Sequence, residues 1–218
     1  MKSRQQRLQS AQLYVCTDAR REQGDFAEFV DAVYRGGADI IQLRDKTLEA
    51  AAELEYFGIL RDAARRHHAL YAANDRADVA AVSGADVLHL GQGDLSLEDA
   101  HRVLPDGVLT GLSTHSVEQA ELALRSAHEY FCIGPVWPTP TKPGRPAVGI
   151  EVVHEVAKLA AATRPERPWF AIGGVNLHTV GELVSVGVRR VAVVRAVGDA
   201  TDPEAAAAAI KAALPPLS

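Results

Sequence analysis

The chain has 218 residues and a formal net charge of −5 at pH 7, with 47% hydrophobic and 23% charged residues. This length suits one α/β barrel domain with a large core, and no block of like charges indicates a nucleic-acid or membrane partner. No apolar run approaches the roughly 20 residues of a membrane-spanning helix.

Residues 1–12 are polar and basic, without the apolar stretch of a signal peptide. We expect a leader that is disordered or loosely docked, followed by a single domain over residues 13–218. Cys16 and Cys132 lie in short apolar runs, where a free thiol behaves as a small hydrophobic group. Two such cysteines without an export signal predict a reducing, cytoplasmic location.

Eight short runs of apolar or β-branched residues predict strands. They lie at 13–17, 39–43, 69–73, 86–90, 108–111, 130–133, 169–172 and 190–194. Amphipathic helices fit between them, the first with Phe26, Phe29, Val30 and Val33 on one face. Helix starts are indicated by three pairs, namely Ser96 with Asp99, Ser116 with Gln119, and Asp202 with Pro203.

Strict alternation of apolar strands and helices predicts a parallel sheet that is covered on both faces. Eight units in so short a chain favour closure into a (β/α)₈ TIM barrel over an open doubly wound sheet. No G-x-G-x-x-G motif follows the first strand, which also argues against a dinucleotide-binding fold. The active site of such a barrel lies at the carboxyl ends of the strands, so these positions carry the functional argument.

Gln42, Arg44 and Lys46 end the second strand and share one face, because side chains alternate along a strand. They predict an anion clamp in which Arg44 forks onto phosphate oxygens and Lys46 acts as a point charge. A pair of surface cations is the alternative.

Asn74 and Asp75 follow the third strand, and Asp94 follows the fourth. Two carboxylates at the ends of adjacent strands predict a site for Mg²⁺, which prefers oxygen ligands and completes its shell with water and phosphate. Either aspartate alone is more often a turn residue or a helix cap. Their position beside a basic strand end favours the metal.

The later strand ends carry further polar groups. Ser113 is placed to donate to a phosphate, whereas His115 is a proton carrier or an ordinary loop histidine. The loop at 134–146 contains five prolines and the polar residues Thr139, Thr141 and Lys142, which predicts a functional lid rather than a linker.

Glycines and backbone amides end the last two strands. The pair Gly173–Gly174 and the segment Val194–Arg195 predict a phosphate site built from backbone N–H groups, although glycine pairs also form simple turns.

Together these segments resemble the thiamine-phosphate synthase family, in the right order from Leu13 onward. The matching motifs are QLRDK at 42–46, ND at 74–75, LGQGD at 90–94, GLSTHS at 111–116, GPVWPTPTK at 134–142 and IGG at 172–174. The resemblance implies that 4-amino-2-methyl-5-(diphosphomethyl)pyrimidine and 4-methyl-5-(2-phosphoethyl)thiazole are joined to give thiamine phosphate and pyrophosphate.

The resemblance also implies a role for each matching residue. The residues implied to hold the pyrimidine pyrophosphate are Gln42, Arg44, Lys46, Asn74, Ser113 and Lys142, of which Arg44, Lys46, Ser113 and Lys142 are the catalytic set. Asp75 and Asp94 are implied to bind Mg²⁺. The residues implied to receive the thiazole phosphate are Thr139, Thr141, Gly174, Val194 and Arg195.

The chemistry of these residues suits a dissociative reaction. Loss of pyrophosphate leaves a cation on the pyrimidine methylene, which the electron-rich ring delocalises, so no protein nucleophile is required. Mg²⁺, Arg44, Lys46 and Lys142 would stabilise the departing anion. Lys142 lies among threonines and prolines, which favours phosphate binding over an imine-forming role.

Two departures and two alternatives qualify this interpretation. The basic segment before Leu13 lies outside the match with the family and is assigned no role. Arg195 stands where the family typically has a small residue such as serine. A related thiazole tautomerase-like enzyme would not need the full set of cations and aspartates. A non-catalytic phosphate-binding barrel would keep the glycine site but not the magnesium aspartates. The partners expected are small molecules, and a homo-oligomer is compatible with the sequence.

Overall fold

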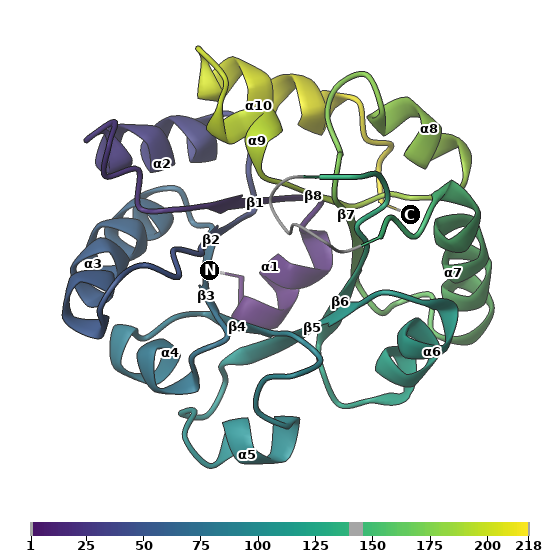
Figure 1. Ribbon diagram of the computed structural model, residues 1–218, viewed down its shortest axis with the longest axis horizontal. Coiled ribbons are helices and arrows are strands. Elements are labelled where there is room, and N and C mark those ends of the chain that lie inside the picture. Colours follow the sequence, from purple (N-terminus) through teal and green to yellow (C-terminus); the bar gives the residue numbers. More distant parts are fainter. Residues whose placement is uncertain (1, 140–145, 218) are drawn as a thin grey trace.

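Eight parallel strands close into a barrel in chain order in the computed structural model, which describes residues 2–139 and 146–217 (Figure 1). The strands are β1 (Leu13–Thr17), β2 (Ile40–Leu43), β3 (Leu70–Asn74), β4 (Val87–Leu90), β5 (Leu109–Thr114), β6 (Tyr130–Ile133), β7 (Trp169–Ile172) and β8 (Val191–Val193). Pairing of β1 with both β2 and β8 completes the ring. The predicted (β/α)₈ barrel is confirmed.

The predicted strands differ from the observed ones mainly at β5. This strand continues to Thr114 because Ser113 and Thr114 pair with Cys132 and Ile133 of β6. Polar residues at a strand end look like loop in a sequence, whereas the neighbouring strand supplies the missing hydrogen-bond partners.

Helices surround the barrel and cover its outer face, apart from the first helix, which lies across one end (Figure 1). They are α1 (Arg4–Ser10), α2 (Phe26–Arg35), α3 (Ala50–Arg66), α4 (Ala77–Ser83), α5 (Leu97–His101), α6 (Val117–Arg125), α7 (Ile150–Thr163), α8 (Val180–Ser185), α9 (Arg195–Gly198) and α10 (Pro203–Ala212). Among the described residues, no helix is both long enough and apolar enough to cross a membrane.

The predicted helix signals are largely confirmed. Phe26, Phe29, Val30 and Val33 of α2 are all buried against the barrel. The side chains of Ser96, Ser116 and Asp202 each accept the backbone N–H three residues on. The capping box at Ser116 is only half formed, because the Gln119 side chain accepts the N–H of His115 instead.

Strand alternation divides the apolar core into two clusters. The larger one lies between the strands and the surrounding helices and includes Leu43 and Phe131. The smaller one fills the barrel interior and includes Tyr14, Tyr130 and Phe170. Cys16 and Cys132 belong to this interior cluster, which confirms that both cysteine side chains are buried.

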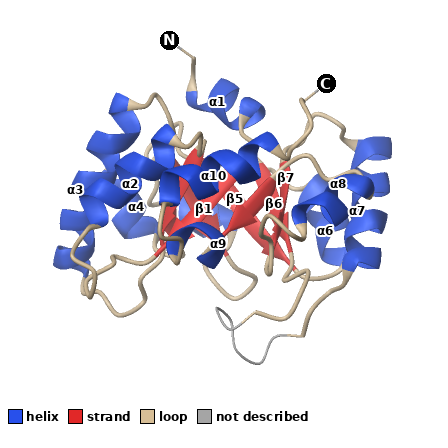
Figure 2. Cartoon of the chain, turned by 90° about the horizontal axis from the view of Figure 1, so that it is seen from above, coloured by secondary structure: helices blue, strands red, loops and turns tan. Residues whose placement is uncertain are grey.

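The N-terminal segment differs from the expected disordered or loosely docked leader. Helix α1 lies across the end of the barrel at which both termini lie (Figure 2). Leu8 is fully buried and joins the interior cluster, and Arg4 forms a 2.6 Å ion pair with Asp86. Arg190 donates to the carbonyl of Gln9 at 2.8 Å. One leucine among polar residues gives no periodic signal, yet it closes the apolar end of the barrel.

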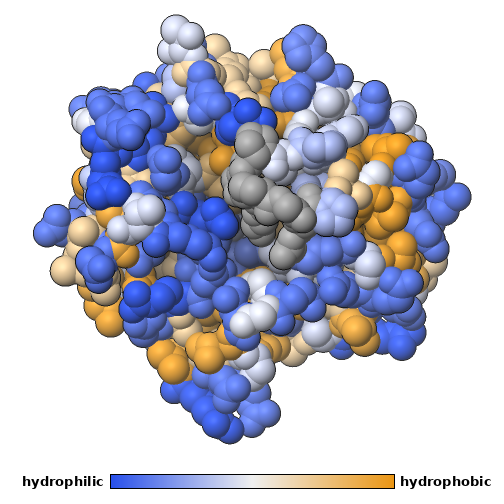
Figure 3. Space-filling view, in the orientation of Figure 1, coloured by the Kyte–Doolittle hydropathy of each residue, from blue (hydrophilic) through white to orange (hydrophobic). Residues whose placement is uncertain are grey.

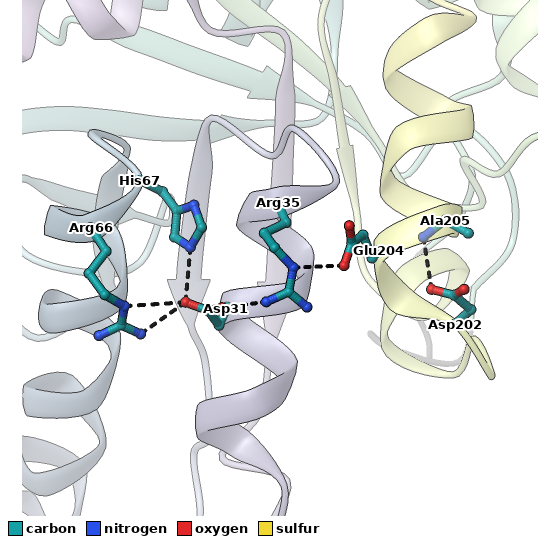
Figure 4. A network of polar contacts seen from close by, with 7 residues as sticks. All are labelled: Asp31, Arg35, Arg66, His67, Asp202, Glu204 and Ala205. Atoms are coloured by element: carbon teal, nitrogen blue, oxygen red, sulfur yellow. Dashed lines mark hydrogen bonds and ion pairs between the residues drawn. The ribbon is translucent and has the colours of Figure 1, made fainter.

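A network of charged side chains joins helices α2, α3 and α10 (Figure 4). Asp31 of α2 accepts from Arg66 and from His67, each at 2.9 Å. Arg35 donates to Asp31 at 2.5 Å and to Glu204 of α10 at 2.8 Å. The hydrogen bond from His67, followed by that from Arg66, lowers the pKa of Asp31 from its ordinary value of 3.8.

We expect Asp31→Asn to lower the free energy of unfolding at pH 7 by about 1 kcal/mol, because several exposed ion pairs are lost together. A depressed folded-state pKa stabilises the protein above the unfolded pKa, and this contribution disappears as the pH falls through the folded value. The difference from wild type should therefore be complete above about pH 5 and vanish in strong acid. Urea unfolding across this range measures it, with the exposed Asp106→Asn as the control. An undiminished difference in strong acid would contradict the assignment.

Candidate active site

A cavity of about 630 Å³ opens at the carboxyl ends of the strands. Hydrophilic residues surround a hollow on this face of the molecule (Figure 3). All the predicted site residues within the described ranges line the cavity, namely Gln42, Arg44, Lys46, Asn74, Asp75, Asp94, Ser113, Thr139, Gly174, Val194 and Arg195. Thr141 and Lys142 lie outside the described residues, as does the part of the predicted lid at 140–145.

The end of β2 presents its polar side chains as strand alternation predicts. Gln42 is buried and donates to the side chain of Asn74 at 2.9 Å, while its carbonyl oxygen accepts from the Cys16 thiol at 3.2 Å. Arg44 continues the strand, with its N–H bonded to the carbonyl of Thr17 at 2.7 Å. These contacts hold the amide of Gln42 in one orientation at the cavity floor.

Asp75 and Asp94 approach each other beside Lys46. The Lys46 ammonium lies 2.8 Å from a carboxylate oxygen of Asp75, and the Asp94 side chain is close enough to shift the pKa of Asp75. Asp94 also accepts the N–H of Gly91 at 2.7 Å. Asp75 has a φ of 61°, a conformation that aspartate tolerates better than most residues, and its N–H is bonded to the carbonyl of His89 at 2.9 Å.

The two carboxyl groups differ in acidity. Partial burial acts on both, but the contact with the Lys46 ammonium outweighs it at Asp75, and the pKa of that group is lowered. Burial raises the pKa of Asp94, and the adjacent Asp75 adds to this rise. No cluster of three or more metal-ligating side chains of His, Cys, Asp or Glu occurs among the described residues. Two carboxylates suit Mg²⁺, which commonly keeps water and phosphate ligands.

Buried polar side chains inside the barrel form a row of hydrogen bonds, and except for Ser113 they were not among the predicted site residues. The Ser113 hydroxyl bonds His89 at 2.9 Å, His89 bonds the Tyr130 hydroxyl at 2.9 Å, and the two tyrosine hydroxyls of Tyr130 and Tyr14 lie 3.1 Å apart. Gly111 leaves space for this chain, because a Cβ there would lie 2.1 Å from the Tyr130 ring. These residues occupy inward strand positions, and that alternation is the signal that could have found them.

Burial raises the pKa of both Tyr14 and Tyr130 well above the ordinary value, so both hydroxyls stay protonated. We therefore expect Tyr130→Phe to leave His89 and Tyr14 without a shared partner and to destabilise the protein by about 1–3 kcal/mol. Chemical denaturation measures this loss. Tyr56→Phe is the matched control, since no hydrogen bond of the Tyr56 hydroxyl is found among the described residues. Equal stabilities of the two variants would show that the hydrogen bonds among His89, Tyr130 and Tyr14 do not stabilise the protein.

The ends of β6 and β7 form the facing wall. Gly174 has a φ of 75°, and a Cβ there would lie 2.7 Å from that of Trp137, so this position requires glycine. The N–H groups of Val136 and Trp137 bond the carbonyls of Ile172 and Gly173 at 2.9 and 3.1 Å. The first residues of the loop after β6 are thereby attached to β7.

His115 was predicted either as a proton carrier or as an ordinary loop histidine. Its Nδ1 lies 2.5 Å from the carbonyl oxygen of Gly134 and must donate to it, because a carbonyl only accepts. The His115 backbone N–H is bonded to Gln119 at 2.8 Å. These contacts favour a role in joining the loops after β5 and β6.

Comparisons with known proteins show the family to which the chain belongs. The family model described as thiamine monophosphate synthase matches residues 13–197. Thiamine-phosphate synthase from Mycolicibacterium smegmatis is 54% identical, with 96% of this chain and 94% of the relative covered. That from Thermobifida fusca is 55% identical, with 94% and 93% covered.

Among solved structures, thiamine phosphate pyrophosphorylase from Pyrococcus furiosus is similar, with a TM-score of 0.82 and 30% identity. The match covers 94% of this chain and 96% of the other. The segments that carry the cavity residues up to Arg195 all lie within the stretch that the family model matches. This chain belongs to the thiamine monophosphate synthase family.

Proposed function

We propose that this protein is a magnesium-dependent, cytoplasmic thiamine-phosphate synthase, in which the residues lining the barrel cavity bind both substrates. It is a transferase that joins the diphosphomethylpyrimidine to the phosphoethylthiazole and releases pyrophosphate. The observation that carries the assignment of the site is the meeting of Arg44, Lys46, Asp75 and Asp94 at one side of a single cavity. Two buried cysteines, Cys16 and Cys132, suit the reducing cytoplasm.

The pyrimidine pyrophosphate is assigned to the side of the cavity formed by β2, β3 and β4. Asp75 and Asp94 would hold Mg²⁺ there, and the ion would offset the negative charge of the pyrophosphate. Lys46 lies 2.8 Å from Asp75, so its ammonium can contact the same anion. The other residues assigned to this substrate are Gln42, Arg44, Asn74 and Ser113, together with Lys142 from the sequence motif.

The thiazole phosphate is assigned to the opposite side. Strands β7 and β8 lie four places around the ring from β3 and β4, so the two walls face each other across the cavity. Gly174 and Thr139 line this wall, as does the backbone of Val194–Arg195. Thr141 is added from the sequence motif. This arrangement separates the two anionic groups and leaves the reacting atoms between them.

The reaction breaks the bond between the pyrimidine methylene carbon and the pyrophosphate oxygen. The electron pair leaves with pyrophosphate, where Arg44, Lys46 and Lys142 stabilise the added charge. The thiazole nitrogen then donates its pair to the methylene carbon. Orientation of the two rings and exclusion of water supply much of the remaining rate enhancement.

Two other functions are weighed against this one. A thiazole tautomerase-like enzyme would not need a pyrophosphate clamp, and here Arg44 and Lys46 line the cavity beside Asn74. A non-catalytic phosphate-binding barrel would not need the paired aspartates, and here both line the cavity beside Lys46. Both observations favour the synthase.

Incubation of the purified protein with both substrates, with and without Mg²⁺, tests the proposal. We expect thiamine phosphate and pyrophosphate to form in equal amounts, as measured by chromatography, and only when Mg²⁺ is present. Folded protein that binds the thiazole phosphate but forms no product would support one of the two alternatives instead.

A further inference from the structure

Arg195 begins α9 directly after β8, lines the cavity and is exposed. Among the described residues, its guanidinium forms no ion pair and no hydrogen bond. Nearby Arg20 shows the opposite behaviour, with its guanidinium donating to Asp25 at 2.7 and 2.8 Å and stacking 4.1 Å from the centre of the Phe29 ring. Arg195 therefore lies at the cavity with none of its five N–H donors bonded to another described residue.

The backbone that carries Arg195 is held on several sides. Strand β8 pairs with β1 and with β7, and Val197 of α9 is fully buried. Arg20 donates to the carbonyl of Gly198 at 2.7 Å, which ties the end of α9 to the start of α2 through Asp25. A side chain whose backbone is held in place and whose guanidinium has no protein partner among the described residues is expected to bind a ligand rather than to form a structural ion pair.

Charge on this wall of the cavity supports the same interpretation. The described residues that line it at and after the ends of β7 and β8 include one cation, Arg195, and one anion, Asp199, both exposed. Without Arg195, a phosphate dianion beside Gly174 would meet backbone groups and the negative charge of Asp199. The cations Arg44 and Lys46 lie at the end of β2, on the other side of the cavity.

We propose that the Arg195 guanidinium binds the phosphate of the thiazole substrate and makes the site prefer the phosphorylated thiazole over its free alcohol. This inference rests on the proposed function and adds a side-chain contact to the backbone contacts assigned above. Guanidinium groups fit phosphate because two parallel N–H groups can donate to two oxygens at once. Because the contact is exposed, we expect it to contribute about tenfold in affinity.

The test compares Arg195→Gln, Arg195→Lys and wild type in steady-state kinetics. Arg195→Gln should raise KM for the thiazole phosphate about tenfold and leave KM for the pyrimidine pyrophosphate within about twofold, with a much smaller effect on kcat. Arg195→Lys should recover part of the lost affinity for the thiazole phosphate, because lysine keeps the positive charge but lacks the two parallel N–H donors of a guanidinium. Arg125→Gln removes the same charge from the exposed face of α6 and serves as the matched control.

Calorimetric titration with the thiazole phosphate, and separately with the thiazole alcohol, measures binding without turnover. Wild type should prefer the phosphate strongly, and Arg195→Gln should lose about tenfold of this preference. An unchanged preference in folded Arg195→Gln, or an equal rise of KM for both substrates, would overturn the inference while wild type still makes thiamine phosphate. Wild-type protein that makes no thiamine phosphate would instead count against the proposed function.

Discussion

Replacing Asp75 with alanine is expected to lower kcat/KM for thiamine phosphate formation by about a thousandfold, because a preorganised charge at the leaving group is lost. Asp75 lies beside Asp94 and 2.8 Å from Lys46, so the change removes a proposed metal ligand and also the partner of a cation. Asp94→Ala should have a similar effect. The double variant should be little worse than either single one, since the two residues act as a unit.

The measurement is steady-state turnover over a range of Mg²⁺ concentrations. Asp78→Ala is the matched control, because Asp78 belongs to α4, lies outside the cavity and pairs with Arg76. We expect this control to retain activity within about twofold. Asp75→Ala protein that keeps wild-type activity with the same Mg²⁺ dependence would contradict the metal assignment. In a non-catalytic phosphate-binding protein, the same variant would bind the thiazole phosphate almost as well as wild type.

Replacing Leu8 with alanine is expected to lower the free energy of unfolding by about 3 kcal/mol, as other truncations of fully buried leucines do. Leu8 has no exposed surface and packs with the cluster inside the barrel. The loss therefore leaves a space at the end of the barrel that α1 covers. Thermal or urea unfolding of the full chain measures it.

Leu122→Ala provides the control, since Leu122 of α6 is 68% exposed. We expect this variant to change stability by less than about 0.5 kcal/mol. If Leu8→Ala were as stable as Leu122→Ala, α1 would be a dispensable leader after all. Activity should be unaffected in molecules that remain folded, because α1 covers one end of the barrel (Figure 2), whereas the cavity opens at the carboxyl ends of the strands.

Local patterns in the sequence determined the fold class and most of the polar residues that line the cavity. Alternation in β2 placed Gln42 inside the barrel and Leu43 against the helices, as the structure confirms. Strand ends identified the polar residues that line the cavity, because parallel strands bring all their carboxyl ends to one side. The same patterns predicted the buried face of α2 and the caps at Ser96, Ser116 and Asp202.

Contacts between distant segments were decided only by the tertiary structure. Leu8 packs inside the barrel although its neighbours are polar, and Ser113 continues β5 because Cys132 pairs with it. The hydrogen bonds from Ser113 through His89 to Tyr130 depend on three different strands. Periodicity reports which face of an element is apolar, but it carries no information on which distant residue will meet that face. Ring closure supplies that information, and it also sets the wall of Gly174 and Arg195 across the cavity from Asp75 and Asp94.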